Sequence, residues 1–500
     1  MVQELKIDRT RAHKGDIYSE ALDRFSDRPI VTIATGATCA YLGDERNLRE
    51  FLIADETARH LRAAGHTVFT LLIDDSMDPL NMRQLRVAVN KDEALIQQYA
   101  SSCGKPIASL PDPWGCHESF AGHFESKLLD RLHGLDCHPV LVSTASLYRN
   151  GVYAPFIRDI LERYDEVTAF LNERFPDYTP DKLFWPLCPE CGYIDETRVE
   201  NVTTATLRFY CRRCERSQAI DLAEVQGKFN WKLDCALRWS LFHIDAEPFT
   251  KAYLEPQSGS FVDAQALSER FFGGHSILPL RYGMVKMDRS LSYKLLASLP
   301  SAALRTMFVE RPTTDVTLTE DLILATASRY EALPGISYYD FARQLLPMWL
   351  LTPEALTAEQ RSLLSSGIAF SAHFLGNEVR LPLPRREKVV QEEPDVLRAM
   401  ASLLSEVIEL RQSSLGDAEP SQETLKPLLS TLGPVKKNVY HCLRSLTGQE
   451  QGLPVTRILG ILPLTYLQLL VDLIEMHLAP EAEFTPEADF VQQPLLRLAA

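Results

Sequence analysis

The sequence predicts a doubly wound α/β domain that is interrupted by a small metal-binding insertion and followed by an all-α region. Three observations carry this prediction. Short β-branched runs alternate with helical patterns from the start of the chain. Four cysteines stand in two close pairs between residues 188 and 214. From Pro300 onward the pattern is helical and rich in Leu and Ala, with few strand signals.

The first α/β unit follows from local sequence. Gly36 ends an apolar run, Gly65 stops a helical pattern, and acidic residues close the next apolar run. Ligands of parallel sheets lie at the carboxyl ends of the strands, so we expect a site at 36–47 and 74–80. The predicted elements are a strand at 29–35, a helix at 47–64 and a strand at 67–73.

Length and composition narrow the class of protein. The chain has 500 residues, 45% of them apolar and 24% charged, which is typical of a folded protein with several domains. It has no run of 18 uncharged apolar residues, and its polar first residues lack the apolar segment of a secretory signal. We therefore expect a cytoplasmic protein with no membrane partner. The net charge of −15 disfavours non-specific nucleic-acid binding. An acidic total charge does not exclude a local basic groove.

The paired cysteines predict a metal site. Cys188-Pro-Glu-Cys191 and Cys211-Arg-Arg-Cys214 are separated by nineteen residues. Four thiolates at this spacing close a tetrahedron around Zn²⁺ and leave no open coordination position, so we expect a structural zinc ion. The other cysteines are scattered, which suits a reducing cytoplasm rather than a disulfide framework.

Two groups of polar residues each allow two interpretations. Asp74, Asp75 and Asp78 either hold a substrate amine at the edge of the sheet or serve as helix caps and turn acids. The second group forms either an acid/base or metal cluster or a set of buried hydrogen-bonding residues, and it comprises His117, Glu118 and His123.

Several segments, in order, resemble the archaeal-type class I lysyl-tRNA synthetases. Residues 111–120 (PDPWGCHESF), followed by His123, match a block of that family closely. Residues 73–80 (IDDSMDPL) resemble the family's acidic strand end, and residues 47–51 (NLREF) resemble the start of the helix that follows its HIGH-type signature. Shorter matches extend the resemblance over most of residues 29–475.

The resemblance implies a Rossmann-like class I synthetase catalytic domain with a zinc-ribbon insertion, followed by an all-α C-terminal region that contacts the tRNA anticodon end. The domains expected from it are 1–185 with 227–300 (catalytic type), 186–226 (four-cysteine zinc-binding insertion), 301–390 (helical, stem-contacting) and 391–500 (α-helical, anticodon-binding-like). The substrate-binding residues expected from it are Gly36, Asn47, Asp74, Asp75, Asp78, His117, Glu118 and His123.

The chain departs from the family at its HIGH-type signature, where it reads Gly43-Asp-Glu-Arg-Asn47. Asp44 stands where the family's first His holds the ATP phosphates, and Arg46 stands where a Gly leaves room for adenine. Only Asn47 fits. An acid facing a triphosphate repels it, and a long side chain fills the adenine slot. ATP and Mg²⁺ are therefore doubtful cofactors.

Three further departures point the same way. The family's GKDH-like run is here Thr250-Lys-Ala-Tyr253, which lacks both the Asp and the His. The KMSKS-type loop is reduced to Lys286-Met-Asp-Arg-Ser290, in which Lys286 and Arg289 are the remaining catalytic candidates. Ala34 replaces the acid expected to face the lysine ammonium.

Three functions stay open on these grounds. The first is a repurposed synthetase-like protein that binds tRNA, an amino acid or an aminoacyl group, assists a protein partner, or forms an amide bond in a biosynthetic pathway. The second is an active, ATP-dependent lysine–tRNA ligase with an altered ATP site. The third is a non-catalytic regulatory binding protein. Four departures at one site favour the first.

Overall fold

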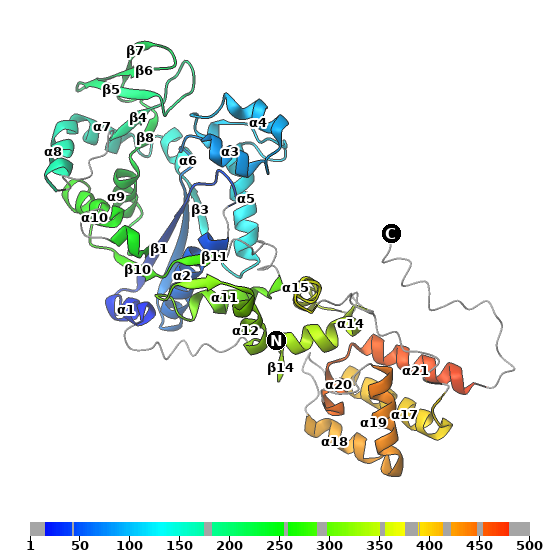
Figure 1. Cartoon of the computed structure of the whole chain (residues 1–500). Helices are drawn as coiled ribbons and strands as arrows, with labels where there is room; N and C mark the ends of the chain where they lie inside the picture. The colour runs from blue at the N-terminus through cyan, green and yellow to red at the C-terminus, as the bar shows by residue number, and fades with distance from the viewer. Residues whose placement is uncertain are drawn as a thin grey trace. The chain divides into compact units, whose positions relative to one another are not determined.

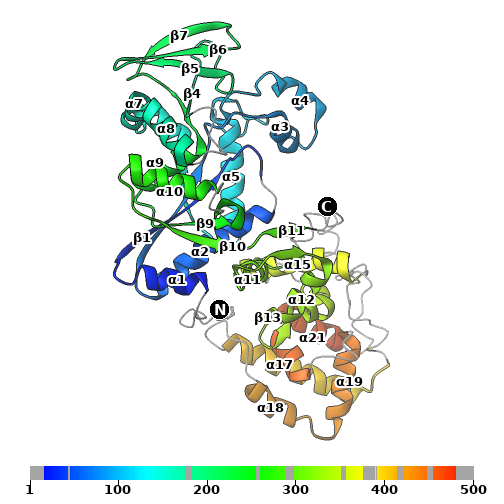
Figure 2. The same cartoon turned by 60° about the vertical axis from the view of Figure 1, so that its left-hand side comes forward.

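The computed structural model describes residues 16–42, 45–174, 183–254, 259–287, 298–350, 356–375, 389, 391–413, 422–447 and 454–479. Figures 1 and 2 show its elements from two directions. The chain divides into two compact units. We call Lys6–Leu296 with Ser301–Ile323 the α/β unit, and Met1–Leu5, Ala297–Pro300 and Leu324–Ala500 the helical unit. The division after Ile323 lies downstream of the boundary that the sequence suggests at residue 300.

The α/β unit is built on a five-stranded parallel sheet with strand order β10-β9-β1-β2-β3. The central strand turns both faces inward, since neighbouring residues Ile33 and Ala34 are fully buried and point to opposite faces. The strand bounds are β1(Ile30–Ala37), β2(Thr67–Asp74), β3(Val140–Ser143), β9(Ala246–Thr250) and β10(Leu278–Tyr282).

Helix α2(Glu45–Ala63) connects β1 to β2 and packs against β1, β2 and β9. Gly65 follows it with a φ of +100°, the left-handed conformation that ends many helices. The predicted order of strand, helix, glycine and strand is therefore found. The opposite face of the sheet is covered by α9(Trp231–Leu241) and α10(Ser260–Phe271), because Leu237 and Leu267 share one apolar cluster with Ala34.

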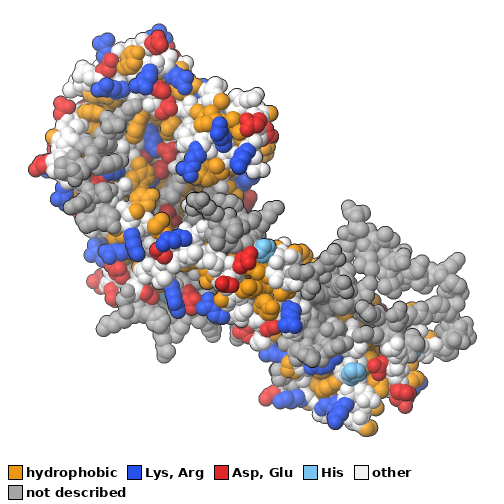
Figure 3. Space-filling view, in the orientation of Figure 1, with side chains coloured by type: hydrophobic (Ala, Val, Ile, Leu, Met, Phe, Trp, Pro, Cys, Tyr) orange, Lys and Arg blue, Asp and Glu red, His pale blue; other side chains and the backbone are white. Residues whose placement is uncertain are grey.

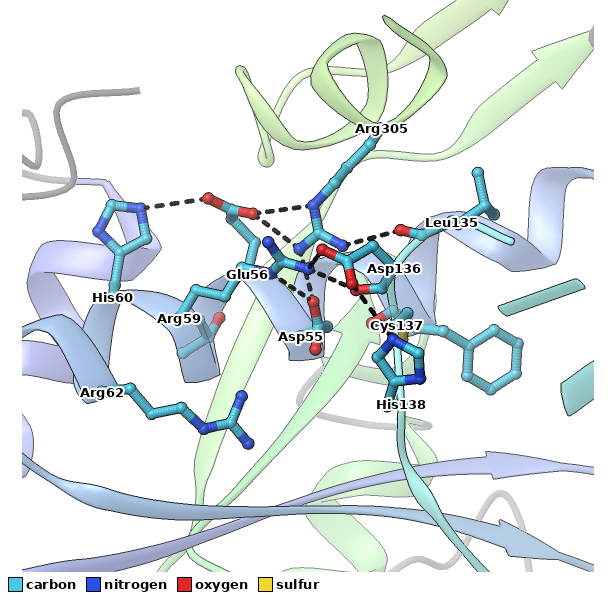
Figure 4. Close-up of polar contacts among 12 residues, drawn as sticks. Asp55, Glu56, Arg59, His60, Arg62, Leu135, Asp136, Cys137, His138 and Arg305 are labelled. Carbon is cyan, nitrogen blue, oxygen red and sulfur yellow. Dashed lines mark hydrogen bonds and ion pairs between the residues drawn. The ribbon is translucent and has the colours of Figure 1, made fainter. Parts of the chain in front are cut away.

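Buried arginines fasten α2 to the segment that follows the sheet. The Arg49 guanidinium is fully buried and donates to backbone carbonyls of Gly283, Phe308, Arg311 and Thr314. Arg305 from α11(Ser301–Val309) reaches the middle of α2 through a cluster of ion pairs, shown in Figure 4. Both contacts fix α11 and the two-stranded sheet of β11(Val285–Met287) and β12(Val316–Leu318) within the α/β unit.

The remaining helices of the α/β unit are α1(Ile17–Arg24), α3(Met82–Ala88), α4(Glu93–Ala100), α5(Phe120–His133), α6(Thr144–Arg149), α7(Ala154–Glu162) and α8(Tyr164–Arg174). The cysteine-bearing insertion stands on an antiparallel pair, β4(Phe184–Pro186) with β8(Gly227–Phe229). Between these strands it forms a three-stranded antiparallel sheet of β5(Thr197–Val202), β6(Thr206–Cys211) and β7(Arg216–Asp221).

The helical unit is all-α apart from one short hairpin among its described residues. Its core joins Leu404, Val439, Ile458 and Leu470, all of them fully buried. The division between the units falls within α12(Glu320–Arg329). The other elements of the helical unit are β13(Glu331–Leu333), β14(Ile336–Ser337), α13(Tyr338–Asp340), the π-helical turn η4(Phe341–Leu345), α14(Leu346–Trp349), α15(Ala358–Phe374), α17(Pro394–Ser413), α18(Gln422–Ser430), α19(Lys436–Leu446), α20(Val455–Ile461) and α21(Leu464–Leu478).

Among the described helices, none is by itself long and apolar enough to span a membrane. Helices α20 and α21 meet the length and composition requirement only when taken together, and a bend of 110° separates them.

Candidate substrate pocket and metal centres

A polar pocket of about 230 Å³ opens at the carboxyl ends of β1 and β9. The strand order reverses between these two strands, since β2 and β3 follow on one side of β1, and β9 and β10 on the other. Such a switch point is where ligands bind in open α/β sheets. The pocket is lined by Gly36, Ala37, Thr38, Glu50, Asp75, Asp78, Lys228, Trp231, Arg238, Glu247, Pro248, Phe249, Tyr253 and Tyr282.

One wall of the pocket centres on Glu50 of α2. Its carboxylate accepts hydrogen bonds from the Tyr282 hydroxyl at 3.1 Å and from the Gly36 backbone amide at 3.4 Å. Burial, together with the negative charge of Glu247, raises the pKa of Glu50 to about 8, although both hydrogen bonds oppose the shift. A cation that binds nearby would lower the pKa of Glu50 and so favour loss of its proton.

A buried ion pair forms the floor. Arg238 of α9 donates to Asp75 at 2.9 Å, and the two side chains are 1% and 6% exposed. Glu247 of β9 accepts from the indole of Trp239 at 2.5 Å, and burial raises its pKa. The arginine is thus shared among several acids, because it lies within the field of both Asp75 and Glu247.

At the rim, Asp78 accepts a hydrogen bond from the Thr38 hydroxyl at 2.6 Å and forms an ion pair with Lys228. The pocket lining holds four carboxyl groups, those of Glu50, Asp75, Asp78 and Glu247, against the two cations Lys228 and Arg238. With Glu50 protonated and the other groups ionised, the lining carries a net charge of −1, and this becomes −2 when Glu50 loses its proton. Either charge favours a cationic ligand.

The structure brings three of the predicted substrate-binding residues to this pocket, namely Gly36, Asp75 and Asp78. Asp74 lies behind the pocket, where its buried carboxylate accepts the Cys39 backbone amide at 2.7 Å. Asn47 is exposed on the first turns of α2. Ala34 is buried in the apolar core beneath the sheet edge rather than at the lining.

The KMSKS-like remnant is described only in part. Lys286 lies on β11 with its side chain 60% exposed and pairs with Asp315 at 3.2 Å. Arg289 and Asp44 lie outside the described residues, as does the side chain of Arg46.

Sequence reasoning missed Glu50, Glu247 and Tyr282 as lining residues. Glu50 and Glu247 both stand inside segments that carry the family resemblance, at 47–51 and 245–249. The first segment does contain a signal for Glu50. In a helix, Glu50 lies about one turn after Asn47 on the same side, so the prediction of Asn47 as a binding residue could have been extended to Glu50.

Two of the other predicted residues, His117 and His123, lie in a second cluster, separate from the pocket lining. The Cys116 sulfur lies 3.2 Å from Nδ1 of His117 and of His123, and 3.1 Å from Oδ2 of Asp112. Ligand atoms of these four residues all lie within 4.8 Å of one another, so the cluster is capable of holding a metal ion. Glu118 is exposed and takes no part in it.

The same cluster has a structural role without a metal. Asp112 accepts hydrogen bonds from the backbone amides of Trp114, Cys116 and His117 at 2.8–3.0 Å. Burial raises the pKa of Asp112, but these hydrogen bonds outweigh it and hold that pKa below its ordinary value. The carboxylate therefore shapes the turn before α5.

The four paired cysteines converge as the sequence predicts. The sulfur atoms of Cys188 and Cys214 lie 3.7 Å apart, and those of Cys191 and Cys211 lie 3.6 Å apart. A tetrahedral zinc ion with Zn–S bonds of about 2.3 Å requires sulfur atoms about 3.8 Å apart, so the residues fit this ion. Gln218 donates to the Cys188 sulfur at 3.2 Å and orients it.

Outside its cysteines, the insertion carries paired surface charges. Arg208, Arg212 and Arg216 are 58–80% exposed, and each forms an ion pair with a glutamate. Figure 3 shows the two signs interspersed over this part of the molecule. The insertion therefore presents no surface of one charge on this face.

Comparisons with known sequences point to one family. A family model described as tRNA synthetases class I (K) matches residues 15–344. A lysine–tRNA ligase of Archaeoglobus fulgidus is 30% identical over 279 residues, 55% of this chain and 54% of that protein. One of Treponema pallidum is 29% identical over 310 residues, 58% and 57% of the two chains. This chain thus spans about half the length of the curated relatives it matches.

Among solved structures, the arginyl-tRNA synthetase of Thermus thermophilus is similar at 14% identity with a TM-score of 0.30, over 92% of this chain and 83% of that one.

Proposed function

Since this chain belongs to the class I lysyl-type tRNA synthetase family, we propose that its pocket binds lysine or an amino acid of the same chemistry. We further propose that the chain is a repurposed member, which binds tRNA or an aminoacyl group but does not charge tRNA in the standard way. The two parts have separate support.

The single observation that carries the binding proposal is the charge of the pocket. Four carboxyl groups face two cations around about 230 Å³ of space. An ammonium group that enters lowers the pKa of Glu50 and favours the carboxylate, which then forms an ion pair with the ligand. The rings of Trp231, Phe249 and Tyr253 supply apolar surface for an aliphatic stem.

The sequence supports the proposal that ATP activation is weakened. Asp44 and Arg46 replace the residues that the family uses for phosphate and adenine, and Tyr253 replaces a histidine at the pocket wall. Loss of one donor to a developing charge typically costs about 10²–10³ in rate, and several such losses compound without being additive.

Two assays test the two parts separately. Isothermal titration with lysine should show binding, whereas norleucine, which lacks the terminal amine, should bind much more weakly. Lysine-dependent pyrophosphate exchange should stay at background. Glu50→Gln should weaken lysine binding, while Glu166→Gln at an exposed site should not.

Each other outcome has a defined meaning. Pyrophosphate exchange at ordinary rates would identify an active lysine–tRNA ligase and overturn the repurposing proposal. Equal binding of lysine and norleucine, or of neither, would overturn the pocket proposal. If the protein binds neither lysine nor tRNA, both parts of the proposal fail, and the third function, a non-catalytic regulatory binding protein, is favoured.

A further inference from the structure

We infer that the four-cysteine insertion positions the pocket carboxylate Asp78, so that losing the zinc ion from the insertion loosens the pocket. The insertion supports both the side chain and the backbone of Asp78, by two separate routes. The effect on ligand binding rests on the proposed function, whereas the effect on Asp78 itself does not.

The first route runs through the base of the insertion. Strand β4 pairs with β8, and Trp185 lies opposite Lys228, whose ammonium forms the ion pair with Asp78. The Leu187 amide donates to the Gln226 carbonyl at 2.8 Å and extends this ladder to the residue before the first zinc ligand, Cys188. Strand β4, which pairs with the strand that carries Lys228, therefore leads directly into the first cysteine pair, Cys188 and Cys191.

The second route runs through Tyr193, two residues after the ligand Cys191. Its hydroxyl donates to the Ser101 carbonyl, and the Lys105 ammonium lies 5.2 Å from the centre of its ring. Arg213, between the other two ligands, lies 4.5 Å from the same ring. The Tyr193 ring thus connects both CxxC pairs of the insertion to the loop that follows α4.

The loop after α4 is the backbone support of Asp78. The Ile194 amide of the insertion donates to the Gly104 carbonyl at 3.0 Å. The Gly104 amide donates to the Leu80 carbonyl at 2.8 Å, and the Ile107 amide donates to the Asp78 carbonyl at 3.0 Å. A short chain of peptide hydrogen bonds therefore connects the insertion to Asp78.

This arrangement makes Tyr193 and Gly104 positioning residues. Neither lines the pocket, but both hold the segment that presents Asp78. Folding of small four-cysteine modules is coupled to metal binding, so loss of zinc should release Tyr193, Ile194 and the β4–β8 ladder together. Asp78 would then keep the hydrogen bond from the Thr38 hydroxyl and the one from its own amide to the Asp75 carbonyl at 2.9 Å.

Gly104→Ala tests the link without touching the zinc ligands or the pocket. Gly104 has a φ of +100°, and an added Cβ would lie 2.4 Å from the Asp195 carboxylate of the insertion. Gly65→Ala is the matched control, because Gly65 also has a φ of +100° but an added Cβ would meet nothing within 4 Å. Both variants carry similar backbone strain, and only the first forces the Asp195 side chain of the insertion to move.

Hydrogen exchange of the Leu80 and Ile107 amides is the direct readout. In Gly104→Ala we expect their exchange to rise by about tenfold or more, with zinc content unchanged. Cys188→Ser should produce the same rise together with loss of zinc. Gly65→Ala should leave both amides as they are in the unmodified protein.

Lysine titration is the second readout, with an expected loss of affinity of about two- to tenfold in Gly104→Ala. If these amides exchange at the unmodified rate in both Gly104→Ala and zinc-free protein, the coupling does not exist. If exchange rises but the unmodified protein never binds lysine, the coupling stands and the proposed function falls.

Discussion

Arg305 offers a sharp test of how α2 is held behind the pocket. Its guanidinium donates to Asp55 at 2.6 Å and to Glu56 at 2.8 Å, and these two acids are 8% and 1% exposed. Arg59 also pairs with Asp55, at 2.8 Å, and with the exposed Asp136 at 2.7 Å (Figure 4). Replacing Arg305 by Met therefore leaves Asp55 with a second arginine but deprives Glu56 of its arginine partner.

Removing one partner of a buried ion pair typically costs about 3–5 kcal/mol, because the other charge stays buried. We expect Arg305→Met to lower the free energy of unfolding of the α/β unit by about this amount. Glu56 keeps His60 at 3.8 Å but loses its guanidinium partner. Adding Glu56→Gln removes that buried charge, so the double variant should be less destabilised than the sum of the single variants.

Unfolding in urea, monitored by hydrogen exchange of the backbone amides of β1 and β2, measures the free energy of unfolding of the α/β unit alone. Arg270→Met is the control, since Arg270 and its partner Glu166 are 60% and 45% exposed and such surface pairs are worth about 0–1 kcal/mol. A cost for Arg305→Met no larger than that of the control, or strict additivity with Glu56→Gln, would refute the reasoning.

Three other predictions concern the metal, the pocket acid and RNA. Cys188→Ser should remove about one zinc ion per chain by elemental analysis, while Cys442→Ser, a buried thiol of the helical unit, should remove none. The raised pKa of Glu50, about 8, means that the folded protein holds this proton more tightly than the unfolded chain. The stabilisation from that proton is present at low pH and is lost as pH rises from about 4.5 to about 8. Urea titrations at about pH 5 and about pH 8 measure the free energy of unfolding of Glu50→Gln and of the unmodified protein. The variant should be more stable relative to the unmodified protein at pH 8 than at pH 5, and the same difference at both pH values would contradict the raised pKa. Residues 424–447 contain basic but no acidic residues, so Lys436→Ala with Lys437→Ala should weaken tRNA binding and reduce the slope of log affinity against log salt by roughly two. Arg398→Ala, which removes an exposed pair with Asp395, should leave that slope unchanged.

Local sequence determined the elements whose signals are complete within a short window. The run of β-branched residues, the helical period and Gly65 predict β1, α2 and β2, because each depends only on neighbours along the chain. The four-cysteine site was predictable for the same reason, since two CxxC pairs suffice to place four thiolates around one ion. The family resemblance likewise followed from contiguous residues, above all the block at 111–120.

Tertiary structure decided which of these residues share a site. Asp74 and Asp75 are neighbours at one strand end, yet Asp74 binds the Cys39 amide inside the unit while Asp75 meets Arg238 in the pocket. Successive strand residues point to opposite faces, and the sequence does not say which face will be hollow. Glu50 and Glu247 became pocket residues only when β1, β9 and α2 were placed together, since nearly two hundred residues of chain separate them. Contacts between segments so distant depend on how whole elements pack, and no local pattern records that packing.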